Sequence, residues 1–292
     1  MIAHAHTEPR KPARVVLLGA SGFIAGAIAG RLASQGIAVL PLGRPVLDLT
    51  NPEAVAVLSG ALRGDDAVVV LAALTPDKGR DGATLLKNLT MMNHACAALE
   101  KTGCAHLVYF SSDAVYGLGP ARVDEDTPAA PQDLYGAMHL AREMMARAVP
   151  KAPVLILRPT LVYGTRDTHN AYGPNRFRRT AQKDGRIQLL GGGEETRDHI
   201  HVDDVAALAA RCLMRGSTGT LNVVTGRSVS FATLAEMVAR QFPNRPEIVK
   251  TPRASPVTHR HYDIINLVKA FPDYKFIALE EGIARCQREP LG

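Results

Sequence analysis

Four side chains whose types can hydrogen-bond to a substrate oxygen and transfer a proton lie in two short segments of this chain. Ser112 and Asp113 directly follow the apolar segment 105–110, which is typical of a buried strand. Tyr135 and His139 are four residues apart in a segment with a helical pattern, so they share one helical face. Ligands of parallel sheets bind at the carboxyl ends of the strands. We therefore expect hydroxyl, carboxylate, phenol and imidazole groups to meet at one substrate site.

A glycine-rich turn near the beginning of the chain predicts a second kind of site. The run Val-Val-Leu-Leu at 15–18 is followed by Gly-Ala-Ser-Gly-Phe-Ile-Ala-Gly at 19–26. The first glycine permits a tight turn, the second lets the backbone approach phosphates, and the following helix offers free N–H groups and its positive dipole end. The spacing G-x-x-G-x-x-A departs from G-x-G-x-x-G, but the order strand, turn, helix predicts a dinucleotide site rather than a plain turn. The predicted cofactor contacts here are Gly19, Ser21, Gly22, Phe23 and Ile24.

Both sites need a framework of alternating strands and helices. Strand-like apolar segments lie at 15–18, 37–42, 67–72, 105–110 and 153–157, and helical patterns lie at 24–35, 52–63, 83–101 and 133–149. Alternation at this spacing predicts right-handed βαβ units and an α/β fold, a Rossmann-type doubly wound parallel sheet. The strands are nearly continuous apolar runs, as expected for strands covered on both faces.

The character of the chain changes after Leu157. Residues 164–198 are rich in Gly, Arg, Asn and Thr, with a short helix expected at about 175–183 and a strand at 187–190. A helix at about 203–215 and a strand at 219–224 are expected to return to the main sheet, whereas a helix at about 230–242 and the Pro-spaced segment 243–256 are not. The predicted organisation is a flexible tail, a dinucleotide-binding domain and a smaller α/β C-terminal substrate lobe. The tail is residues 1–12. The dinucleotide-binding domain is residues 13–164, and residues 200–226 return to it. The substrate lobe is residues 165–199 and 227–292.

Composition excludes several classes of protein. The chain has 292 residues, of which 46% are hydrophobic and 21% charged, and no apolar run approaches the roughly 20 residues that span a bilayer. Residues 1–14 are polar and lack the apolar core of a signal peptide. The four scattered cysteines favour reduced thiols in a cytoplasmic protein. The net charge of +6 indicates a basic surface or attraction for an anionic small molecule, and no basic run with aromatics points to nucleic acid.

The motifs together give a specific resemblance. Beside the glycine turn, the chain carries Ser-Ser-Asp-Ala-Val-Tyr-Gly at 111–117, Tyr-Gly at 135–136, Arg-Pro-Thr-Leu-Val-Tyr-Gly at 158–164 and Arg-Asp-His-Ile-His-Val-Asp-Asp-Val at 197–205. In order and spacing it resembles the extended short-chain dehydrogenase/reductase family of NAD(P)-dependent nucleotide-sugar epimerases, dehydratases and reductases. The resemblance covers nearly the whole chain and implies hydride transfer between a nicotinamide and a sugar carbon.

The resemblance also implies catalytic roles. Ser112 would hydrogen-bond the reacting substrate oxygen and Tyr135 would be the catalytic phenol, which needs a nearby positive charge to act as a base. In the family a lysine supplies that charge and bonds the nicotinamide ribose, and here its position holds His139. His139 either keeps both tasks when protonated or marks a site without ordinary hydride chemistry. Asp113 is a proton donor or a turn residue, and Ala114 replaces the glutamate base of 4,6-dehydratases, which favours an epimerase or a ketoreductase.

Cofactor preference depends on the end of the second strand. Arg44 follows Leu-Gly there, and an arginine without a carboxylate suits the 2′-phosphate of NADP, so we favour NADP over NAD. The Leu-Asp-Leu-Thr at 47–50 matches the adenine contact of the family, with Asp48 as acceptor, and the pattern is similar to dTDP-4-dehydrorhamnose reductases. Leu49, Ala72 and Ala73 complete the predicted cofactor contacts.

The substrate side resembles a pocket for a nucleoside diphosphate. Asn175, Arg197 and Arg260 match positions that hold the diphosphate or nucleotide, and arginine forks suit phosphate oxygens. The His-x-His at 199–201 is expected to be a strand-to-helix junction capped by Asp203 or Asp204, not a metal site.

Two other functions stay open from the sequence. One is a non-catalytic dinucleotide-binding sensor or partner subunit, although keeping both Ser112 and Tyr135 argues against it. The other is a reductase of a non-nucleotide carbonyl substrate. A homodimer through the helices at 83–101 and 133–149 is a further expectation from the resemblance.

Overall fold

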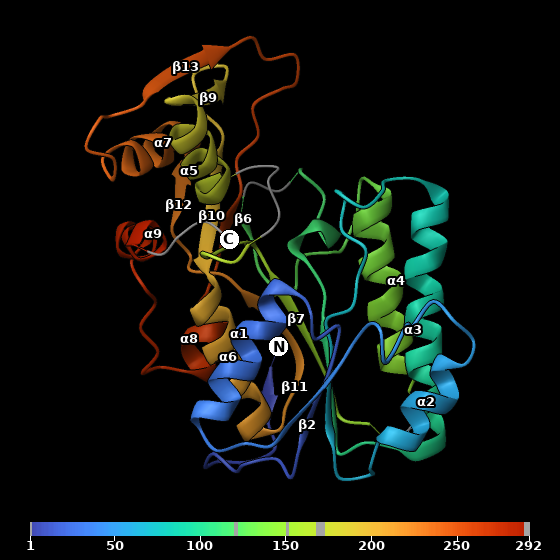
Figure 1. The fold of residues 1–292 in the computed structure, drawn as a ribbon. Helices are drawn as coiled ribbons and strands as arrows, with labels where there is room; N and C mark the ends of the chain where they lie inside the picture. The colour runs from blue at the N-terminus through green and yellow to red at the C-terminus, as the bar shows by residue number, and fades with distance from the viewer. Residues whose placement is uncertain (1, 120–121, 150–151, 168–172, 289–292) are drawn as a thin grey trace.

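The computed structural model describes residues 2–119, 122–149, 152–167 and 173–288, and Figure 1 shows a main sheet with a smaller lobe at one end. Parts of the predicted tail, dinucleotide-binding domain and substrate lobe lie outside the described residues. These are residues 1, 120–121, 150–151, 168–172 and 289–292.

The main sheet has seven strands in the order β1-β11-β7-β5-β4-β2-β3. All neighbouring pairs are parallel except β1 with β11. The strands are β1 (Ala3–His4), β2 (Val15–Leu18), β3 (Val39–Leu42), β4 (Ala67–Val70), β5 (His106–Phe110), β7 (Val154–Pro159) and β11 (Ser217–Val223). Every residue of β2, β4 and β5 is buried, which explains their unbroken apolar runs. The prediction of a doubly wound parallel sheet is confirmed.

Helices cover both faces of this sheet (Figure 1). On one face α1 (Phe23–Ser34) packs against α6 (Val202–Arg215), and on the other α2 (Ala54–Ala61), α3 (Gly82–Thr102) and α4 (Leu134–Ala148) lie side by side. Each face has its own apolar core, because successive residues of a strand point to opposite sides. Val108 and Phe110 of β5 therefore join the core under α1 and α6, whereas Leu107 and Tyr109 join the core under α3 and α4.

The chain leaves β2 in one direction to β3 and then returns to pair β4 on the other side of β2. This reversal of strand order opens a crevice at the carboxyl ends of β2 and β4, where α/β sheets bind their ligands. It places the glycine turn of residues 19–22 at the edge of that crevice.

The smaller lobe holds three short sheets and its own core. β8 (Leu161–Tyr163), β10 (Thr196–His201) and β12 (Ser228–Ser230) form one sheet, β9 (Arg186–Leu190) pairs with β13 (Glu247–Thr251), and β6 (Arg122–Val123) pairs with β14 (His261–Tyr262). The helices α5 (Gly173–Asp184), α7 (Phe231–Ala239) and α9 (Leu279–Arg288) bury an apolar cluster against β9, and α8 (Ile265–Ala270) packs near β11. β8 begins at Leu161, two positions after β7 ends at Pro159, so the smaller lobe continues directly from a strand of the main sheet.

The structure corrects the prediction of a flexible tail over residues 1–12. Ala3–His4 forms β1 and completes the edge of the main sheet. His4 Nδ1 lies 2.8 Å from Ser217 Oγ, and the backbone N–H of Arg10 donates to the carbonyl of Met214 at 2.8 Å. The edge of β11 that faces away from β7 offers backbone hydrogen-bond partners to this polar segment. The segment is therefore ordered without a hydrophobic pattern of its own.

The expected cap of α6 is also wrong. The helix begins at Val202, and the side chain of the preceding His201 accepts a hydrogen bond from the N–H of Asp203 at 3.2 Å. Asp204 instead accepts from the Tyr274 hydroxyl at 2.6 Å and from the N–H of Ile277 at 3.1 Å. Both aspartates are in the first turn, where carboxylates suit the helix dipole, rather than at the capping position.

Candidate active site

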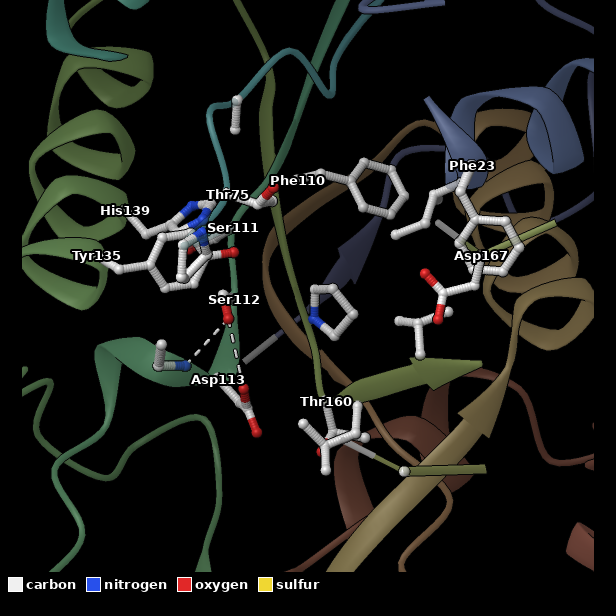
Figure 2. Close-up of a pocket in the computed structure, with 18 of the residues that line it drawn as sticks. Phe23, Thr75, Phe110, Ser111, Ser112, Asp113, Tyr135, His139, Thr160 and Asp167 are labelled. Atoms are coloured by element: carbon white, nitrogen blue, oxygen red, sulfur yellow. Dashed lines mark hydrogen bonds between the residues drawn. The ribbon is translucent and has the colours of Figure 1, made fainter. Parts of the chain in front are cut away.

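A cavity of about 710 Å³ lies between the carboxyl ends of the main strands and the smaller lobe. Its wall holds many of the side chains that the sequence singled out, and Figure 2 shows Tyr135 and His139 projecting from α4 toward Ser112 while Phe23 lies on the α1 side. The predicted residues in this wall are Gly22, Phe23, Ile24, Ala73, Ser112, Asp113, Tyr135, His139, Asn175, Arg197 and Arg260.

The first turn of α4 brings Tyr135 and His139 together. Asp133 caps this helix by accepting the N–H of Gly136 at 2.8 Å. The rings of Tyr135 and His139 then meet edge to face, with centroids 4.6 Å apart. A Cβ at Gly136 would collide with the carbonyl oxygen of Ala114, so only glycine lets the start of α4 approach the turn that carries Ser112.

Tyr135 keeps its proton in this environment. Burial and, to a lesser extent, the neighbouring Asp113 carboxylate raise the pKa of Tyr135. Hydrogen bonding to Ser112 and the charge of Arg142 oppose them in part, and the resulting pKa is about 12. A phenol with such a pKa is a proton donor at neutral pH and needs help to act as a base.

His139 is buried and held by a strand residue that the sequence analysis passed over. The Tyr109 hydroxyl lies 2.7 Å from Nδ1 of His139, and the imidazole is 3% exposed. Burial and repulsion from the Arg142 charge lower the pKa of His139 to about 3. Nε2 of His139 has no hydrogen-bond partner among the described residues and belongs to a side chain in the cavity wall.

Ser112 and Asp113 begin a short 3₁₀ turn, η1 (Asp113–Val115), directly after β5. Ser112 Oγ caps this turn by accepting the N–H of Ala114 at 3.1 Å, as the dashed lines of Figure 2 show. The Tyr262 hydroxyl of the smaller lobe donates to Asp113 Oδ2 at 2.5 Å. Asp113 thus faces the cavity while tied to the smaller lobe.

A buried ion pair lies between α4 and β7, next to the carboxyl end of β5. Arg158 of β7 donates to both carboxylate oxygens of Glu143 on α4, at 2.9 and 2.7 Å. Glu143 also accepts from Ser111 at 2.6 Å, and Arg158 donates to the Tyr116 hydroxyl at 2.9 Å. This fully bonded network fixes α4 against β5 and β7, so it sets the distance between Ser112 and Tyr135.

The glycine turn fits the pyrophosphate of a dinucleotide. Gly19 has a φ of +93°, and a Cβ there would lie 2.7 Å from backbone atoms of Ala72. The N-terminus of α1 has Gly22 at its cap, no side chain accepting its N–H groups and no acidic residue in its first turn. Unclaimed N–H groups and a positive dipole end facing a cavity are what an anionic ligand requires.

The predicted contacts to the adenosine half lie outside the cavity wall. Arg44 is exposed at the end of β3, directly after Gly43, whose added Cβ would lie 3.4 Å from the N of Ala20 in the glycine turn. Asp48 Oδ1 accepts the N–H and the hydroxyl of Thr50 at 2.9 and 2.7 Å, and these hydrogen bonds lower the pKa of Asp48. The remaining predicted contacts that do not line the cavity are Gly19, Ser21, Leu49 and Ala72.

The residues that the sequence predicts to bind the substrate differ in how many of their polar atoms already make hydrogen bonds within the protein. Arg197 donates to Glu195 at 2.5 Å and to the Thr258 hydroxyl at 2.7 Å, so its fork is held by its own lobe. Arg260 is 4% exposed and donates to the carbonyl of Gly117 at 2.5 Å, and its Nε has no partner among the described residues.

Asn175 offers an unused acceptor on the same side of the cavity. Its amide nitrogen donates to the carbonyl of Gly164 at 2.9 Å and to the Asp167 carboxylate at 2.7 Å. Its Oδ1 is buried without a partner in the described part of the chain. The orientation of the amide is therefore fixed, with an acceptor left for a ligand.

Sequence reasoning missed three residues at this site. Tyr109 of β5 precedes Ser111, the residue directly after β5, by two positions, so strand alternation was the signal that they share a face. Arg142 follows His139 by three residues, so helical spacing was the signal that it shares the face of His139, and it is completely buried. His199 lines the cavity, is 3% exposed, and neither ring nitrogen has a hydrogen-bond partner among the described residues.

Two kinds of site are not seen within the described ranges. No group of three or more His, Cys, Asp or Glu side chains there is placed to hold a metal ion. None of the helices in the same ranges is long and apolar enough to cross a membrane.

Comparison with known proteins matches the chain to one family model over most of its length. The model of the NAD dependent epimerase/dehydratase family matches residues 15–224. This range includes the glycine turn, Ser112, Tyr135 and Arg197, and it ends before Arg260.

Two curated proteins illustrate the similarity. The chain is 31% identical over 206 residues to N-acetyl-alpha-D-glucosaminyl-diphospho-ditrans,octacis-undecaprenol 4-epimerase of Escherichia coli O157:H7, covering 65% of this chain and 60% of that protein. It therefore spans less than two thirds of that relative's length. It is 28% identical over 290 residues to dTDP-4-dehydro-6-deoxy-D-allose reductase of Streptomyces bikiniensis, covering 86% of this chain and 88% of that protein.

Among solved structures, that of RMD from Pseudomonas aeruginosa complexed with NADPH superposes with a TM-score of 0.81. The two chains are 24% identical, and the match covers 94% of this chain and 97% of that one. This similarity shows that the two chains share their fold.

Proposed function

Because the chain belongs to the NAD-dependent epimerase/dehydratase family, we propose that it is an NAD(P)-dependent ketoreductase or epimerase of a nucleotide-sugar. One observation carries the proposal. Ser112, Tyr135 and His139 face a single cavity that also contains the N-terminus of α1. A proton donor and a dinucleotide-binding helix end thereby share one site.

The proposed substrate is a sugar joined to a nucleoside diphosphate. Both curated relatives act, by their names, on sugars attached to a diphosphate. On this chain the buried Arg260 has an unused Nε–H, and Asn175 has an unused acceptor, so a phosphate and a polar group of the nucleotide have partners. Arg197 would line the cavity and not bind phosphate, since its guanidinium already donates hydrogen bonds to Glu195 and Thr258.

A bound nicotinamide dinucleotide would supply hydride transfer to or from the sugar carbon. Ser112 would hold the sugar oxygen, and Tyr135 would donate a proton to that oxygen as a ketone is reduced. Because the pKa of Tyr135 is raised to about 12, the phenol carries this proton at neutral pH and can donate it to the sugar oxygen. Asp113 would orient the sugar, since its carboxylate is held by Tyr262.

Elimination of water from the sugar is not part of this proposal. Ala114 follows Asp113 where the resemblance to 4,6-dehydratases requires a glutamate base. A methyl group cannot remove a proton, and Asp113 is already engaged by Tyr262. These two residues support reduction or epimerisation over dehydration.

His139 stands, in this proposal, at the position of the family's ribose-binding lysine. Its pKa of about 3 keeps the imidazole neutral at neutral pH, so it contributes a hydrogen bond and no charge. We also propose NADP as the preferred cofactor, because Arg44 is exposed beside the glycine turn and suits a 2′-phosphate.

A cytoplasmic homodimer completes the proposal. Within the described residues the four cysteines form no disulfide, in keeping with a reducing compartment. The helices α3 and α4 expose Leu86, Leu134 and Met144, which are 65%, 42% and 66% accessible. Exposed apolar side chains on adjacent helices suit a self-complementary contact. Light scattering of the protein and of Met144→Glu tests the dimer.

The experiment that tests the function measures ketone reduction directly. The protein is mixed with NADPH or NADH and with dTDP- or UDP-linked 4-ketohexoses, and both cofactor oxidation and the sugar product are followed. From a ketoreductase we expect matched amounts of oxidised cofactor and reduced sugar, and from an epimerase a sugar of changed configuration without net oxidation of the cofactor. In either case Tyr135→Phe should lose turnover and retain cofactor binding. Turnover of free ketoses alone would favour the non-nucleotide reductase, and cofactor binding without any turnover, epimerisation included, would favour the sensor.

A further inference from the structure

The contact between β5 and α4 determines which nitrogen of His139 carries its proton. The Tyr109 hydroxyl and Nδ1 of His139 are 2.7 Å apart, and both side chains are buried. In the described part of the chain the Tyr109 hydroxyl makes no other side-chain or backbone hydrogen bond. If Nδ1 were the donor, the hydroxyl proton would be buried without an acceptor, which is costly.

The favourable arrangement has Tyr109 donating to Nδ1. Burial raises the pKa of Tyr109, so the hydroxyl keeps the proton that it donates. A neutral imidazole that accepts at Nδ1 carries its proton at Nε2. Nε2 is the buried ring atom without a described partner, on a side chain of the cavity wall, so an N–H donor is presented where a ligand oxygen would lie.

Arg142 lies one helical turn beyond His139 and is completely buried. Its guanidinium donates to the carbonyl of Ala72 at 2.7 Å and lies 5.1 Å from the centre of the Tyr109 ring. Its charge lowers the pKa of His139 and also that of Tyr135, for which burial is the larger and opposing effect. Charged groups act on His139 and on the two tyrosines that face it, Tyr109 on β5 and Tyr135 on α4. They are Arg142 and Glu143 on α4, Asp133 at the cap of α4 and Asp113 on η1.

We propose that Tyr109 is a positioning residue that holds His139 as the Nε2–H tautomer, and that Arg142 supplies the fixed positive charge beside Tyr135. Nε2–H then donates to the ribose of the bound dinucleotide. Two tasks that the family assigns to one lysine are thereby divided between an uncharged donor and a buried cation that does not enter the cavity. The inference rests on the proposed function for the identity of the ligand, but the tautomer is a property of the ligand-free protein.

Nuclear magnetic resonance tests the tautomer without any variant. Long-range proton–nitrogen spectra of the protein labelled with ¹⁵N-histidine distinguish a protonated from an unprotonated ring nitrogen. We expect a protonated Nε2 and a bare Nδ1 for His139, unchanged between about pH 5 and about pH 8, the range in which ordinary histidines titrate. A proton on Nδ1, or titration of His139 in that range, overturns the proposal.

Removal of the Tyr109 hydroxyl tests its positioning role. In Tyr109→Phe we expect a mixture of His139 tautomers and about a tenfold weaker affinity for NADPH, the effect of one lost hydrogen bond. The matched control is Tyr274→Phe, which removes a hydroxyl bonded to Asp204 away from the cavity. It should leave both readouts unchanged. An unaltered His139 tautomer in Tyr109→Phe would show that the hydroxyl has no such role.

A charge exchange tests Arg142. His139→Lys alone places a second cation beside a buried one, so we expect lower thermal stability and weaker NADPH binding. His139→Lys combined with Arg142→Met moves the charge to the lysine, and we expect binding to recover. Equal binding by the single and double variants would remove Arg142 from the proposal. Because these readouts are spectra, melting and cofactor affinity, they stand or fail independently of turnover of any sugar.

Discussion

The Tyr262 hydroxyl of the smaller lobe donates a 2.5 Å hydrogen bond to the carboxylate of Asp113 at the end of the main sheet. This bond joins the two parts of the molecule across the edge of the cavity. We expect Tyr262→Phe to lower kcat/KM for the sugar substrate about tenfold, since a hydrogen bond to a charged group contributes roughly 1.5–3 kcal/mol. Cofactor affinity should stay the same, because the glycine turn lies at the other end of the cavity.

The control for this variant is again Tyr274→Phe, because Tyr274 donates to Asp204 in a similar bond at 2.6 Å. Thermal stability should fall in this control while steady-state kinetics stay at the wild-type values. Equal kinetic losses in the two variants would mean that Tyr262 acts through general stability and not through Asp113.

The glycine turn gives a prediction whose control, Gly26, lies on the helix that follows the turn. Gly19→Ala places a Cβ 2.7 Å from the backbone of Ala72 at a φ of +93°. We expect cofactor affinity to fall more than about tenfold and the free energy of unfolding to fall by at least about 1–2 kcal/mol. Gly26→Ala has open space around its Cβ and should stabilise α1 by about 0.5–1 kcal/mol with affinity unchanged. Calorimetric titration measures the affinity, and urea unfolding measures the stability. Wild-type affinity in Gly19→Ala would contradict the prediction that this turn binds the cofactor.

Cofactor preference is predicted to depend on Arg44. Arg44→Ala should weaken NADPH binding about tenfold and leave NADH binding nearly unchanged, because only NADPH carries the 2′-phosphate. Arg31→Ala, an exposed arginine in the last turn of α1, provides the control for a general loss of positive charge. Fluorescence titration with both cofactors decides the matter, and an unchanged ratio of the two affinities in Arg44→Ala would exclude this role.

The buried histidines predict a loss of stability in acid. Burial lowers the pKa of His199 to about 4, below the value of about 6.5 in an unfolded chain. Between these two values the unfolded chain binds a proton that the folded protein does not, so stability falls as pH falls. For His199 alone the loss between about pH 6.5 and about pH 4.5 is on the order of 2 kcal/mol. His139 acts in the same direction, with its pKa lowered to about 3.

Urea unfolding of His199→Phe at the two pH values measures the contribution of this residue. The variant should lose distinctly less stability in acid than the wild type. His261→Gln, at an exposed position, should show the full wild-type loss. If His199→Phe lost as much as the wild type, the imidazole would have to be protonated in the folded state.

The main sheet was predictable because its strands are buried on both faces. Val15–Leu18 and Ala67–Val70 are apolar throughout. The glycine turn marks the end of β2, and the Asp81 cap marks the start of α3 after β4. In contrast, β1 has two residues, and its pairing depends on Ser217 and Thr218 more than 200 positions away. No local pattern encodes such a strand, because its partner supplies the stabilisation.

The site was predictable in its residue types but not in its electrostatics. The motifs brought Ser112, Tyr135 and His139 to one cavity, as their spacing required. Helical spacing puts Arg142 on the same face as His139, but its complete burial depends on the packing of α3, α4 and the loop after β4. The tautomer and the low pKa of His139 depend on the burial of Arg142 and on the hydrogen bond with Tyr109. Both are therefore consequences of tertiary structure.

The short first strand has a consequence for how the protein behaves in a crowded solution. β1 covers the edge of β11, and the chain then runs on to Arg10 with backbone bonds to Arg215 and Met214. An uncovered edge of a parallel sheet is a template for strands of other chains, and the two-residue strand Ala3–His4 blocks it without creating a new long edge. Removal of the first ten residues should therefore cost colloidal stability, with molecules joining edge to edge while each sheet stays folded.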